Sequence, residues 1–214
     1  MSFAFSLFNQ CRKPNGWLGQ LNLWSMNRRH SKVTDWGLQQ VSIRSRDTLL
    51  DVGCGGGRTV SKLAAIAVEG KVYGVDFSAE SVAVSCKTNR KSIADGRVEI
   101  RQNSVSQLPF HDRMFDLVTA AETHYYWPDL PANFQEVMRV LKAGGTFLLI
   151  AEAYKGGKYD QMLRRLEELK TIMTYAHLTV EEHRDLFNQT GFQDVQVLEK
   201  YEKGWICAWG KKPA

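Results

Sequence analysis

From about residue 47 onward, short apolar runs alternate along the chain with segments whose apolar residues recur at helical spacing. Each of the runs 48–53, 71–78, 97–101, 115–121 and 146–153 has the length and the Val, Ile, Leu or Phe content of a buried strand. Between several of them, apolar residues recur every three or four positions, which is typical of a helix with one buried face. This alternation predicts stacked βα units around a mostly parallel sheet.

Local signals mark where some of these helices begin and end. Ser78 is a suitable N-cap for the helix after the second strand, with Glu80 in its first turn. Pro131 can open a later helix, which Ala143-Gly144-Gly145 should stop. The apolar stripe of this later helix would consist of Phe134, Val137, Met138 and Leu141. After the first strand, the corresponding stripe would consist of Val60, Leu63, Ala64 and Ala67.

The C-terminal part of the chain follows a different pattern. Amphipathic helices are expected over 158–174, with a stripe that starts at Met162, and over 179–189. The runs 195–200 and 205–210 read as strands joined by a Glu-Lys-Gly turn, which favours an antiparallel pair. The expected sheet therefore has seven strands.

We interpret residues 1–214 as one α/β domain, since this length would be cramped for two. Segment 1–46 would form an N-terminal helical cap, in which Trp17, Leu21 and Trp24 make a helix stripe. The remaining parts would be a core at 47–152, a helical lid at 153–190 and a C-terminal strand pair at 191–214.

Composition and charge narrow the class of protein. Apolar residues make up 43% and charged residues 24% of the sequence, as in an ordinary globular protein, and no apolar run approaches the roughly 20 residues of a membrane span. The N-terminus lacks the features of a secretory signal, and four scattered cysteines form no CxxC pair, so we expect a cytoplasmic protein without disulfides or a zinc site. The net charge of +5 is dispersed, which does not favour a nucleic-acid surface.

The stretch LLDVGCGGG at 49–57 points to a ligand site. Glycines directly after a buried strand let bare backbone approach a ligand at the carboxyl end of a parallel sheet. Asp76 ends the second strand, where a carboxylate can accept hydrogen bonds from both hydroxyls of a ribose. Dinucleotides and other nucleosides share this geometry.

Two residues argue against a dinucleotide. The G-x-G-x-x-G pattern of dinucleotide sites would place its last glycine at position 58, where this chain has Arg58. Asp51, at the strand end, is poorly placed against a pyrophosphate and better suited to a positive centre such as an amino acid's ammonium group. A nicotinamide dehydrogenase therefore remains a remote alternative.

With these residues in view, the chain resembles the class I S-adenosylmethionine-dependent methyltransferases. The resemblance rests on four motifs in order: DVGCGGG (51–57), VYGVDFS (72–78), LPFHDRMFDLVTA (108–120) and EVMRVLKAGGTFLLI (136–150). The resemblance covers roughly residues 47–152. Within the superfamily, the chain most resembles the small-molecule branch that includes the quinone-pathway C-methyltransferases. It implies a doubly wound, Rossmann-like, mostly parallel seven-stranded sheet with an antiparallel C-terminal hairpin, with S-adenosylmethionine as cofactor and S-adenosylhomocysteine as product.

The resemblance also implies roles for individual residues. Asp51 and the glycine loop would hold the methionine part of the cofactor, Asp76 the ribose hydroxyls, and Phe77 the adenine. Ser104 and Val105 stand where relatives often carry a Gly-Asp-Ala run, so the acid that would meet the adenine amine is missing. The complete set of expected cofactor-binding residues is Asp51, Gly53, Cys54, Gly55, Gly57, Asp76, Phe77, Ser104, Val105 and Glu122.

The segment AETHYYWPDL (121–130) follows the fourth strand, next to the expected methyl group. Glu122 or His124 could accept a proton from the acceptor, and Tyr125 is a third candidate catalytic residue. The aromatic run could instead simply cover the sheet edge. A metal ion is not expected, because only Glu122 and Asp129 supply carboxylates here.

The acceptor pocket would come from the aromatic-rich segments 16–36 and 153–178, although such residues more often pack in a core. The candidate substrate residues are Trp17, Met26, His30, Tyr126 and Tyr154. His111 and His183 are expected at the surface.

These observations favour an enzyme that transfers a methyl group by in-line displacement to a small, partly apolar or aromatic acceptor. Two alternatives stay open: a methyltransferase that modifies RNA or protein, and a non-catalytic protein that binds S-adenosylmethionine for regulation. The sequence does not indicate the oligomeric state.

Overall fold

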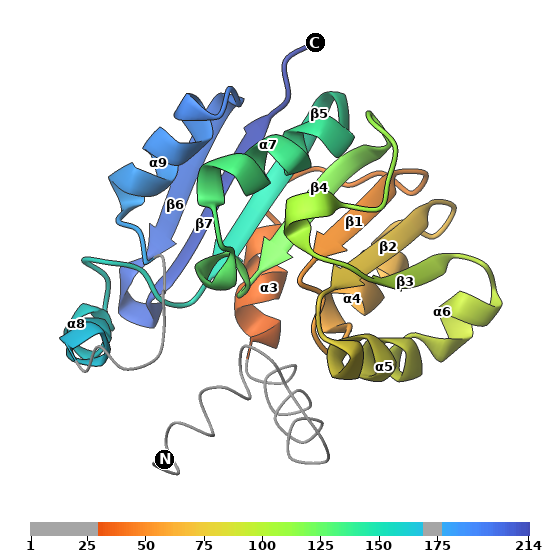
Figure 1. The fold of residues 1–214 in the computed structure, drawn as a ribbon, viewed down its shortest axis with the longest axis horizontal. Coiled ribbons are helices and arrows are strands. Elements are labelled where there is room, and N and C mark those ends of the chain that lie inside the picture. The colour runs from red at the N-terminus through yellow and green to blue at the C-terminus, as the bar shows by residue number, and fades with distance from the viewer. Residues whose placement is uncertain (1–29, 169–176) are drawn as a thin grey trace.

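A seven-stranded sheet runs through the protein (Figure 1). The computed structural model describes residues 30–168 and 177–214 of the chain. The strands are β1 (Thr48–Val52), β2 (Lys71–Asp76), β3 (Val98–Gln102), β4 (Phe115–Ala121), β5 (Leu141–Ala151), β6 (Gln193–Lys200) and β7 (Trp205–Lys211). Their order is β3-β2-β1-β4-β5-β7-β6. Strands β1 to β5 are parallel, and β7 pairs antiparallel with both β5 and β6. The predicted fold class is confirmed, including the antiparallel C-terminal hairpin.

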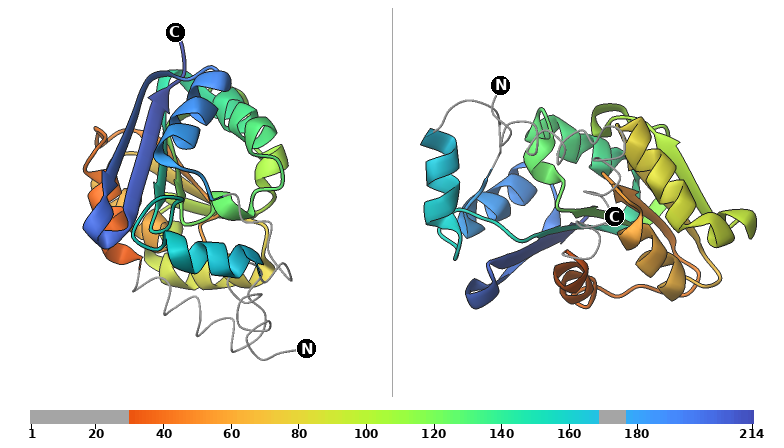
Figure 2. Two further views of the ribbon diagram at one scale, coloured as in Figure 1. Left: turned by 90° about the vertical axis from the view of Figure 1, so that its left-hand side faces the viewer. Right: turned by 90° about the horizontal axis from the view of Figure 1, so that it is seen from below.

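Helices cover both faces of this sheet. They are α3 (Ser31–Leu38), α4 (Arg58–Ile66), α5 (Ala79–Thr88), α6 (Arg90–Ala94), α7 (Leu130–Val140), α8 (Asp160–Glu168) and α9 (Val180–Gln189). Short 3₁₀ turns are η1 (Val105–Gln107), η2 (His124–Tyr126) and η3 (Tyr201–Lys203). In Figure 1, α7 and α9 lie in front of the sheet and α3 behind it, and the side views of Figure 2 show the same layering.

The two faces bury separate cores because successive residues of a strand point to opposite sides. Leu50 packs in the core that contains Phe134 of α7 and Phe187 of α9. Leu49 packs in the other core, with residues of α3 and α4. Both leucines are fully buried, as expected for a parallel strand covered by helices on each face.

Helix α3 packs very closely on the sheet. A Cβ built on Gly37 would lie 2.5 Å from Cδ1 of Ile150 in β5, so only glycine allows this approach. The close packing fixes the start of α3, and with it His30, at the end of the sheet where β4 and β5 finish.

Several predicted helix boundaries are confirmed. Ser78 caps α5 by accepting a hydrogen bond from the Ser81 N–H, and Pro131 lies in the first turn of α7 after the N-cap Asp129. A capping box formed by Thr179 and Glu182 begins α9. These caps satisfy N–H groups that would otherwise lack a partner.

Other expectations were wrong or lie outside the described residues. Helix α7 ends at Val140 rather than at the glycines of 143–145, because Leu141 already pairs with Phe115 and begins β5. Among residues 160–165 of α8, whose side chains the structure describes, Leu163 is buried, whereas Met162, expected on the apolar stripe, is 52% exposed. The stripe of Trp17, Leu21 and Trp24 falls outside the described part of the chain.

Candidate functional site

The glycine-rich segment forms the turn between β1 and α4. Gly53, Gly55 and Gly57 have φ angles of 72°, 49° and 79°, in the left-handed region where a side chain is unfavourable. The N–H groups of Gly53 and Cys54 both donate to the carbonyl of Val75, at 2.7 and 3.0 Å, which fixes the turn against β2. A Cβ on Gly53 would collide with the side chain of Thr123, so the turn also packs against the loop after β4.

Asp76 lies beside this turn at the end of β2. Its two carboxylate oxygens accept hydrogen bonds from the N–H groups of Ser78 and Gly55, each at 2.9 Å. Burial raises the pKa of Asp76, and these two hydrogen bonds lower it. The carboxylate is thereby held in one orientation, and its oxygens retain further lone pairs for a ligand's hydroxyl groups.

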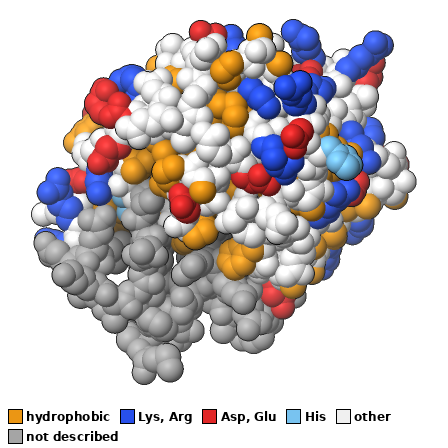
Figure 3. Space-filling model, turned by 45° about the horizontal axis from the view of Figure 1, so that its top comes forward, with side chains coloured by type: hydrophobic (Ala, Val, Ile, Leu, Met, Phe, Trp, Pro, Cys, Tyr) orange, Lys and Arg blue, Asp and Glu red, His pale blue; other side chains and the backbone are white. Residues whose placement is uncertain are grey.

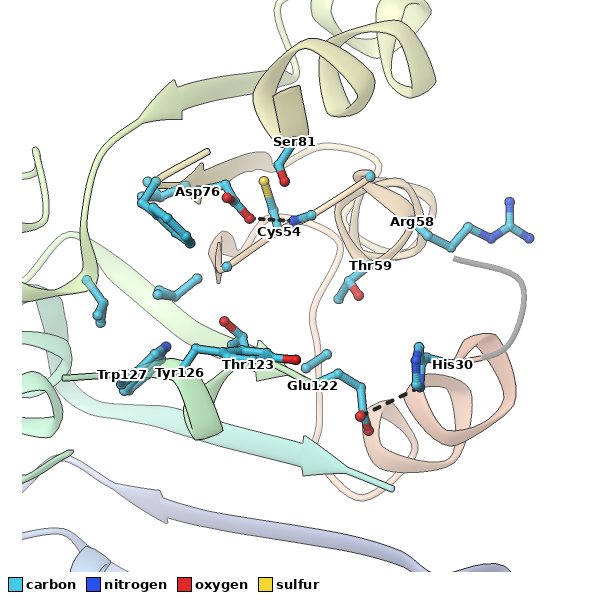
Figure 4. A pocket seen from close by; sticks show the side chains of 18 of the residues that line it. His30, Cys54, Arg58, Thr59, Asp76, Ser81, Glu122, Thr123, Tyr126 and Trp127 are labelled. Carbon is cyan, nitrogen blue, oxygen red and sulfur yellow. Dashed lines mark hydrogen bonds and ion pairs between the residues drawn. The ribbon is translucent and has the colours of Figure 1, made fainter. Parts of the chain in front are cut away.

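A cavity of about 350 Å³ opens over the ends of β1, β2 and β4 (Figure 4). Ten of the predicted site residues line it: His30, Gly53, Cys54, Gly55, Asp76, Phe77, Ser104, Val105, Glu122 and Tyr126. Figure 4 shows Asp76 and Ser81 on one side of the cavity and Glu122 and Tyr126 on the other. The size suits a small ligand.

The end of the cavity expected to hold adenine contains Phe77, which is 44% exposed and so does not belong to the core. Ser104 uses its Oγ to accept the Ser106 N–H at 3.2 Å, which caps η1. Asn103 also lines the cavity, and its Oδ1 accepts the Ser104 N–H at 2.8 Å. The polar groups at this end are therefore a hydroxyl, an amide and backbone groups, in place of the missing acid.

Asp51 does not line the cavity. It is 1% exposed and accepts a hydrogen bond from Thr119 Oγ1 at 2.7 Å. Burial raises the pKa of Asp51 to about 7, the bond from Thr119 lowers it, and the nearby Asp76 raises it. The structure thus places Asp51 beneath the glycine turn, where it contacts β4. Gly57 is likewise absent from the lining, because it faces Ser85 and Asn89 of the α5 segment.

Glu122 follows β4 at the opposite end of the cavity, in a left-handed backbone conformation with φ of 59°. Its Oε2 accepts a hydrogen bond from the Tyr125 hydroxyl at 3.2 Å and lies 3.6 Å from Nδ1 of His30. The same His30 nitrogen lies 3.2 Å from Oε2 of Glu152, just after β5. Burial raises the pKa of Glu122 to about 7, with His30 lowering it and Glu152 raising it.

His124 and Tyr125 are buried behind this end of the cavity and do not line it. The His124 ring lies 5.5 Å from the ring of His183 and 4.2 Å from that of Tyr125. Burial holds the pKa of His124 well below its usual value, and His183 and His177 lower it further. His124 is therefore a neutral packing residue, without direct access to a ligand in the cavity.

The expected surface position of His183 was wrong, since only 1% of the residue is exposed. Its Nδ1 lies 2.7 Å from the carbonyl of Thr179, and its ring packs toward η2. His111 is exposed, as expected.

Tyr154, a candidate substrate residue, also lies away from the cavity. Its side chain is buried, and its hydroxyl group donates to the carboxylate of Glu199 in β6. Burial and the Glu199 carboxylate raise the pKa of this hydroxyl. Trp17 and Met26 fall outside the described residues.

Some lining residues were not singled out from the sequence. Thr59 and Ser81 come from the first turns of α4 and α5, and Thr123 comes from the loop after β4. Because the carboxyl ends of parallel strands meet at one edge, the residues just after β1, β2 and β4 could have been inspected for this role. Glu152, which pairs with His30 but does not line the cavity, follows β5 and fell inside the strand expected over 146–153.

These groups fit S-adenosylmethionine. The N–H groups of Gly53, Cys54 and Gly55 donate within the protein, so the carboxylate of a methionine tail would meet the start of α4, where the first N–H groups have no acceptor within the helix. Asp76 offers lone pairs to ribose hydroxyls, and the exposed ring of Phe77 offers a face for a flat base. Among the described residues, no group of three or more His, Cys, Asp or Glu side chains is arranged to hold a metal ion. No helix in the described ranges is long and apolar enough to cross a membrane.

Comparison with known proteins identifies a family and several relatives. A family model described as "Methyltransferase domain" matches residues 50–149. The chain is 31% identical over 187 residues to the 27-O-demethylrifamycin SV methyltransferase of Amycolatopsis mediterranei, covering 80% of this chain and 68% of that protein. It is 32% identical over 126 residues to the 2-phytyl-1,4-naphtoquinone methyltransferase of Nostoc punctiforme, covering 58% of this chain and 55% of that protein.

A solved structure has the same fold. It is the methyltransferase in the complex with the Trm112 activator of Haloferax volcanii, with a TM-score of 0.76, 21% identity, and coverage of 90% of this chain and 94% of that one. The chain spans between 54% and 63% of the length of several curated relatives.

Proposed function

The chain belongs to the class I S-adenosylmethionine-dependent methyltransferases, and from this membership we propose that it methylates a small molecule. The observation that carries the proposal is a single cavity that joins a nucleoside end, at Asp76 and the glycine turn, to an end with a buried carboxylate and aromatic rings. A ligand bound at the first end would present its reactive group toward the second.

When bound, the cofactor supplies a methyl group already activated on a sulfonium. In an in-line displacement the acceptor–methyl bond forms while the sulfur–methyl bond breaks and its electron pair stays on sulfur. The protein's main contribution is then to align the groups, and positioning alone can lower a barrier by roughly 7–11 kcal/mol. Asp76 would bind the ribose, Phe77 the adenine, and the turn at Gly53 to Gly55 the methionine tail.

Glu122 is our candidate for the group that accepts a proton from the acceptor. It lines the cavity, and burial raises its pKa to about 7, close to the value at which a general base works best near neutral pH. Tyr125 acts through Glu122, because its hydroxyl donates to the carboxylate and orients it.

We propose a partly apolar or aromatic acceptor. Tyr126 and Trp127 line the cavity, with Tyr126 nearer to Glu122 than Trp127 is (Figure 4), and flat rings of this kind favour a flat partner. By their names, the relatives cited above act on a 2-phytyl-1,4-naphthoquinone and on a 27-O-demethylrifamycin SV. This is consistent with the interpretation drawn from the residues.

The surface charge gives no support to an RNA substrate. On the face drawn in Figure 3, Lys and Arg side chains stand among Asp and Glu side chains. Arg139, for example, pairs with Asp112 and Glu136, and Lys142 pairs with Asp116. A nucleic-acid surface would instead need unpaired basic groups along one face.

The test is to incubate the protein with S-adenosylmethionine and a panel of quinols, phenols and hydroxylated polyketides, and to measure S-adenosylhomocysteine. Turnover with one class, lost in Asp76→Ala, is the expected result. Tight binding of both cofactor forms without turnover across the panel would favour a non-catalytic binding protein. Activity only with RNA, and falling steeply with salt, would favour the nucleic-acid alternative.

A further inference from the structure

Three ionisable side chains from separate parts of the chain meet at the acceptor end of the cavity. His30 precedes α3, Glu122 follows β4 and Glu152 follows β5. The His30 Nδ1 lies between the two carboxylates, 3.6 Å from Glu122 Oε2 and 3.2 Å from Glu152 Oε2. Figure 4 shows His30 and Glu122 next to each other, with a dashed line marking the ion pair between them. We call these three residues the acidic cluster.

The cluster has more negative charge than it can neutralise internally. One imidazole, even when protonated, balances only one of two ionised carboxylates. The Glu122 side chain is only 13% exposed, and its Oε1 is buried without a hydrogen-bond partner in the part of the chain that the structure describes. A buried carboxylate oxygen in this state is costly, and the left-handed φ of Glu122 adds backbone strain. Such strain is typical of a functional site.

A cationic ligand would relieve this imbalance. In S-adenosylmethionine the sulfonium joins the nucleoside to the amino-acid tail. The sulfonium would therefore lie between the part of the cavity near Asp76, which would bind the ribose, and the part near the glycine turn, which would bind the tail. Glu122 lines that same cavity from the end of β4, the strand next to β1 on the side away from β2. The product, S-adenosylhomocysteine, has the same shape without the methyl group and without the positive charge on sulfur.

We propose that the acidic cluster distinguishes the cationic methyl donor from the neutral product by exchanging one proton at Glu122. Donor binding favours the ionised carboxylate and releases a proton to solvent from the molecules that carry one, whereas product binding leaves the protonation of the carboxyl group as it is in the free protein. The exchange balances as one carboxyl O–H bond broken and one proton delivered to the buffer. This inference rests on the proposed function, since it requires that the cavity binds both cofactor forms.

The groups that act on Glu122 allow this exchange near neutral pH. Burial raises the pKa of Glu122 to about 7. His30 from the start of α3 and the Tyr125 hydroxyl from η2 lower this pKa, and Glu152 from the end of β5 raises it. Any added positive charge next to the carboxylate would lower the pKa further, and each unit of difference between two ligand complexes changes their affinity ratio tenfold.

A purely structural role for the cluster makes a different prediction. If the pairs of His30 with Glu122 and Glu152 only hold α3 against the ends of β4 and β5, the two cofactor forms should release the same number of protons. Their affinity ratio should then be independent of pH once the titration of their own amino groups is allowed for.

The experiment is isothermal titration calorimetry of the full chain with S-adenosylmethionine and with S-adenosylhomocysteine, in phosphate and in Tris at pH 7. The difference in apparent enthalpy between the two buffers gives the number of protons released. We expect about half a proton more for the donor than for the product, because Glu122 is about half ionised in the free protein at this pH. Between pH 6 and pH 8, the donor-to-product affinity ratio should rise about fivefold to tenfold.

Two variants test whether the difference in proton release comes from Glu122. Glu122→Gln keeps the size of the side chain and removes its titration, so the difference in proton release and its part of the pH dependence should disappear. Glu202→Gln, at an exposed position in η3, is the matched control and should behave like the wild type. The ligands' own amino groups titrate alike in both variants.

The outcomes separate the two proposals. Equal proton release for donor and product in the wild type, or a difference that persists in Glu122→Gln, overturns the role of the acidic cluster and leaves the proposed function intact. No binding of either ligand overturns both. The wild-type measurement decides the question even if Glu122→Gln does not fold.

Discussion

The cofactor end and the acceptor end of the cavity are built in different ways. At the cofactor end, Asp76 and the glycine turn come from one continuous βαβ segment, and both carboxylate oxygens of Asp76 accept backbone hydrogen bonds. At the acceptor end, His30, Glu122 and Glu152 come from three distant segments. Glu122 has a strained backbone and a buried oxygen without a hydrogen-bond partner within residues 30–168 and 177–214. The first end is preorganised by local backbone geometry, whereas the second holds unbalanced charge that depends on what is bound.

The largest effect should come from the backbone of the cofactor end. Gly53→Ala should destabilise the protein by about 3 kcal/mol or more, because two costs add. A residue with a Cβ costs about 1–2 kcal/mol in the left-handed conformation, and the new Cβ would also collide with the side chain of Thr123. Urea unfolding measures the loss. Gly144→Ala is the matched control, because Gly144 has the same φ of 72° and nothing within 4 Å of its added Cβ. Equal losses in the two variants would show that the turn is not tightly packed against the β4 loop.

The second effect tests the carboxylate at that end. Asp76→Ala should weaken S-adenosylhomocysteine binding by about 1.5–3 kcal/mol, because it removes charge-assisted hydrogen bonds to the ribose. Calorimetry gives the affinity directly, and Asp95→Ala, at an exposed position after α6, provides the control. An unchanged affinity would contradict the ribose assignment and with it the orientation of the ligand in the cavity.

Sequence reasoning succeeded where the information is local. The turn at Gly53 to Gly57 and Asp76 stand in adjacent elements, and their spacing alone predicts that they face one ligand. The strands and the antiparallel C-terminal pair were also predicted, because period and length distinguish buried strands from helices, and the resemblance to the methyltransferases implied the doubly wound sheet. The end of α7 was not, since Leu141 enters β5 through its pairing with Phe115, a contact that no local pattern reveals.

The acceptor end could be predicted only in part for the same reason. Glu122 was identified because it directly follows a strand. Glu152 follows β5 at the same edge of the sheet but fell inside the strand expected over 146–153, and its pairing with His30 depends on the packing of α3 on β5, which no local pattern reveals. Asp51 was expected to help hold the methionine part of the cofactor, and the pairing of β1 with β4 places Thr119 against its carboxylate, beneath the cavity lining. His183 looked like a surface residue because α9 is mostly polar, yet its position faces η2.

The third prediction concerns the stability of the acceptor end. The folded-state pKa of Glu122, about 7, lies above its ordinary value, so the folded protein binds the proton more tightly than the unfolded chain. Glu122 therefore costs stability that grows as the pH rises from about 4.5 to about 7 and is constant above that range. Replacing it by Gln should raise the free energy of unfolding, relative to wild type, by about 1–2 kcal/mol more at pH 8 than at pH 5.

Urea denaturation at the two pH values measures this difference, with Glu202→Gln as the control. A variant that is less stable than wild type by the same amount at both pH values would mean that Glu122 is ionised and well paired throughout. The acceptor end would then be as fully satisfied as the cofactor end, and the contrast between them would fail.

The smallest effect lies behind the acceptor end, where the neutral ring of His183 backs the loop that carries Glu122. Burial lowers the pKa of His183 to about 4, so the unfolded chain takes up a proton first as the pH falls below about 6.5. The contribution of His183 to stability is therefore complete above that pH and declines toward pH 4, a loss of about 1 kcal/mol between pH 7 and pH 5.5. In His183→Leu, which cannot take up the proton, the decline in urea-unfolding free energy over this range should be smaller than in wild type by that amount. The exposed His111→Leu should not change this decline.

Because Glu122 titrates in the opposite sense, the decline must be measured as a difference between each variant and the wild type. A difference between His183→Leu and wild type that does not change with pH would show that His183 is solvated and that the acceptor loop lacks a rigid apolar support.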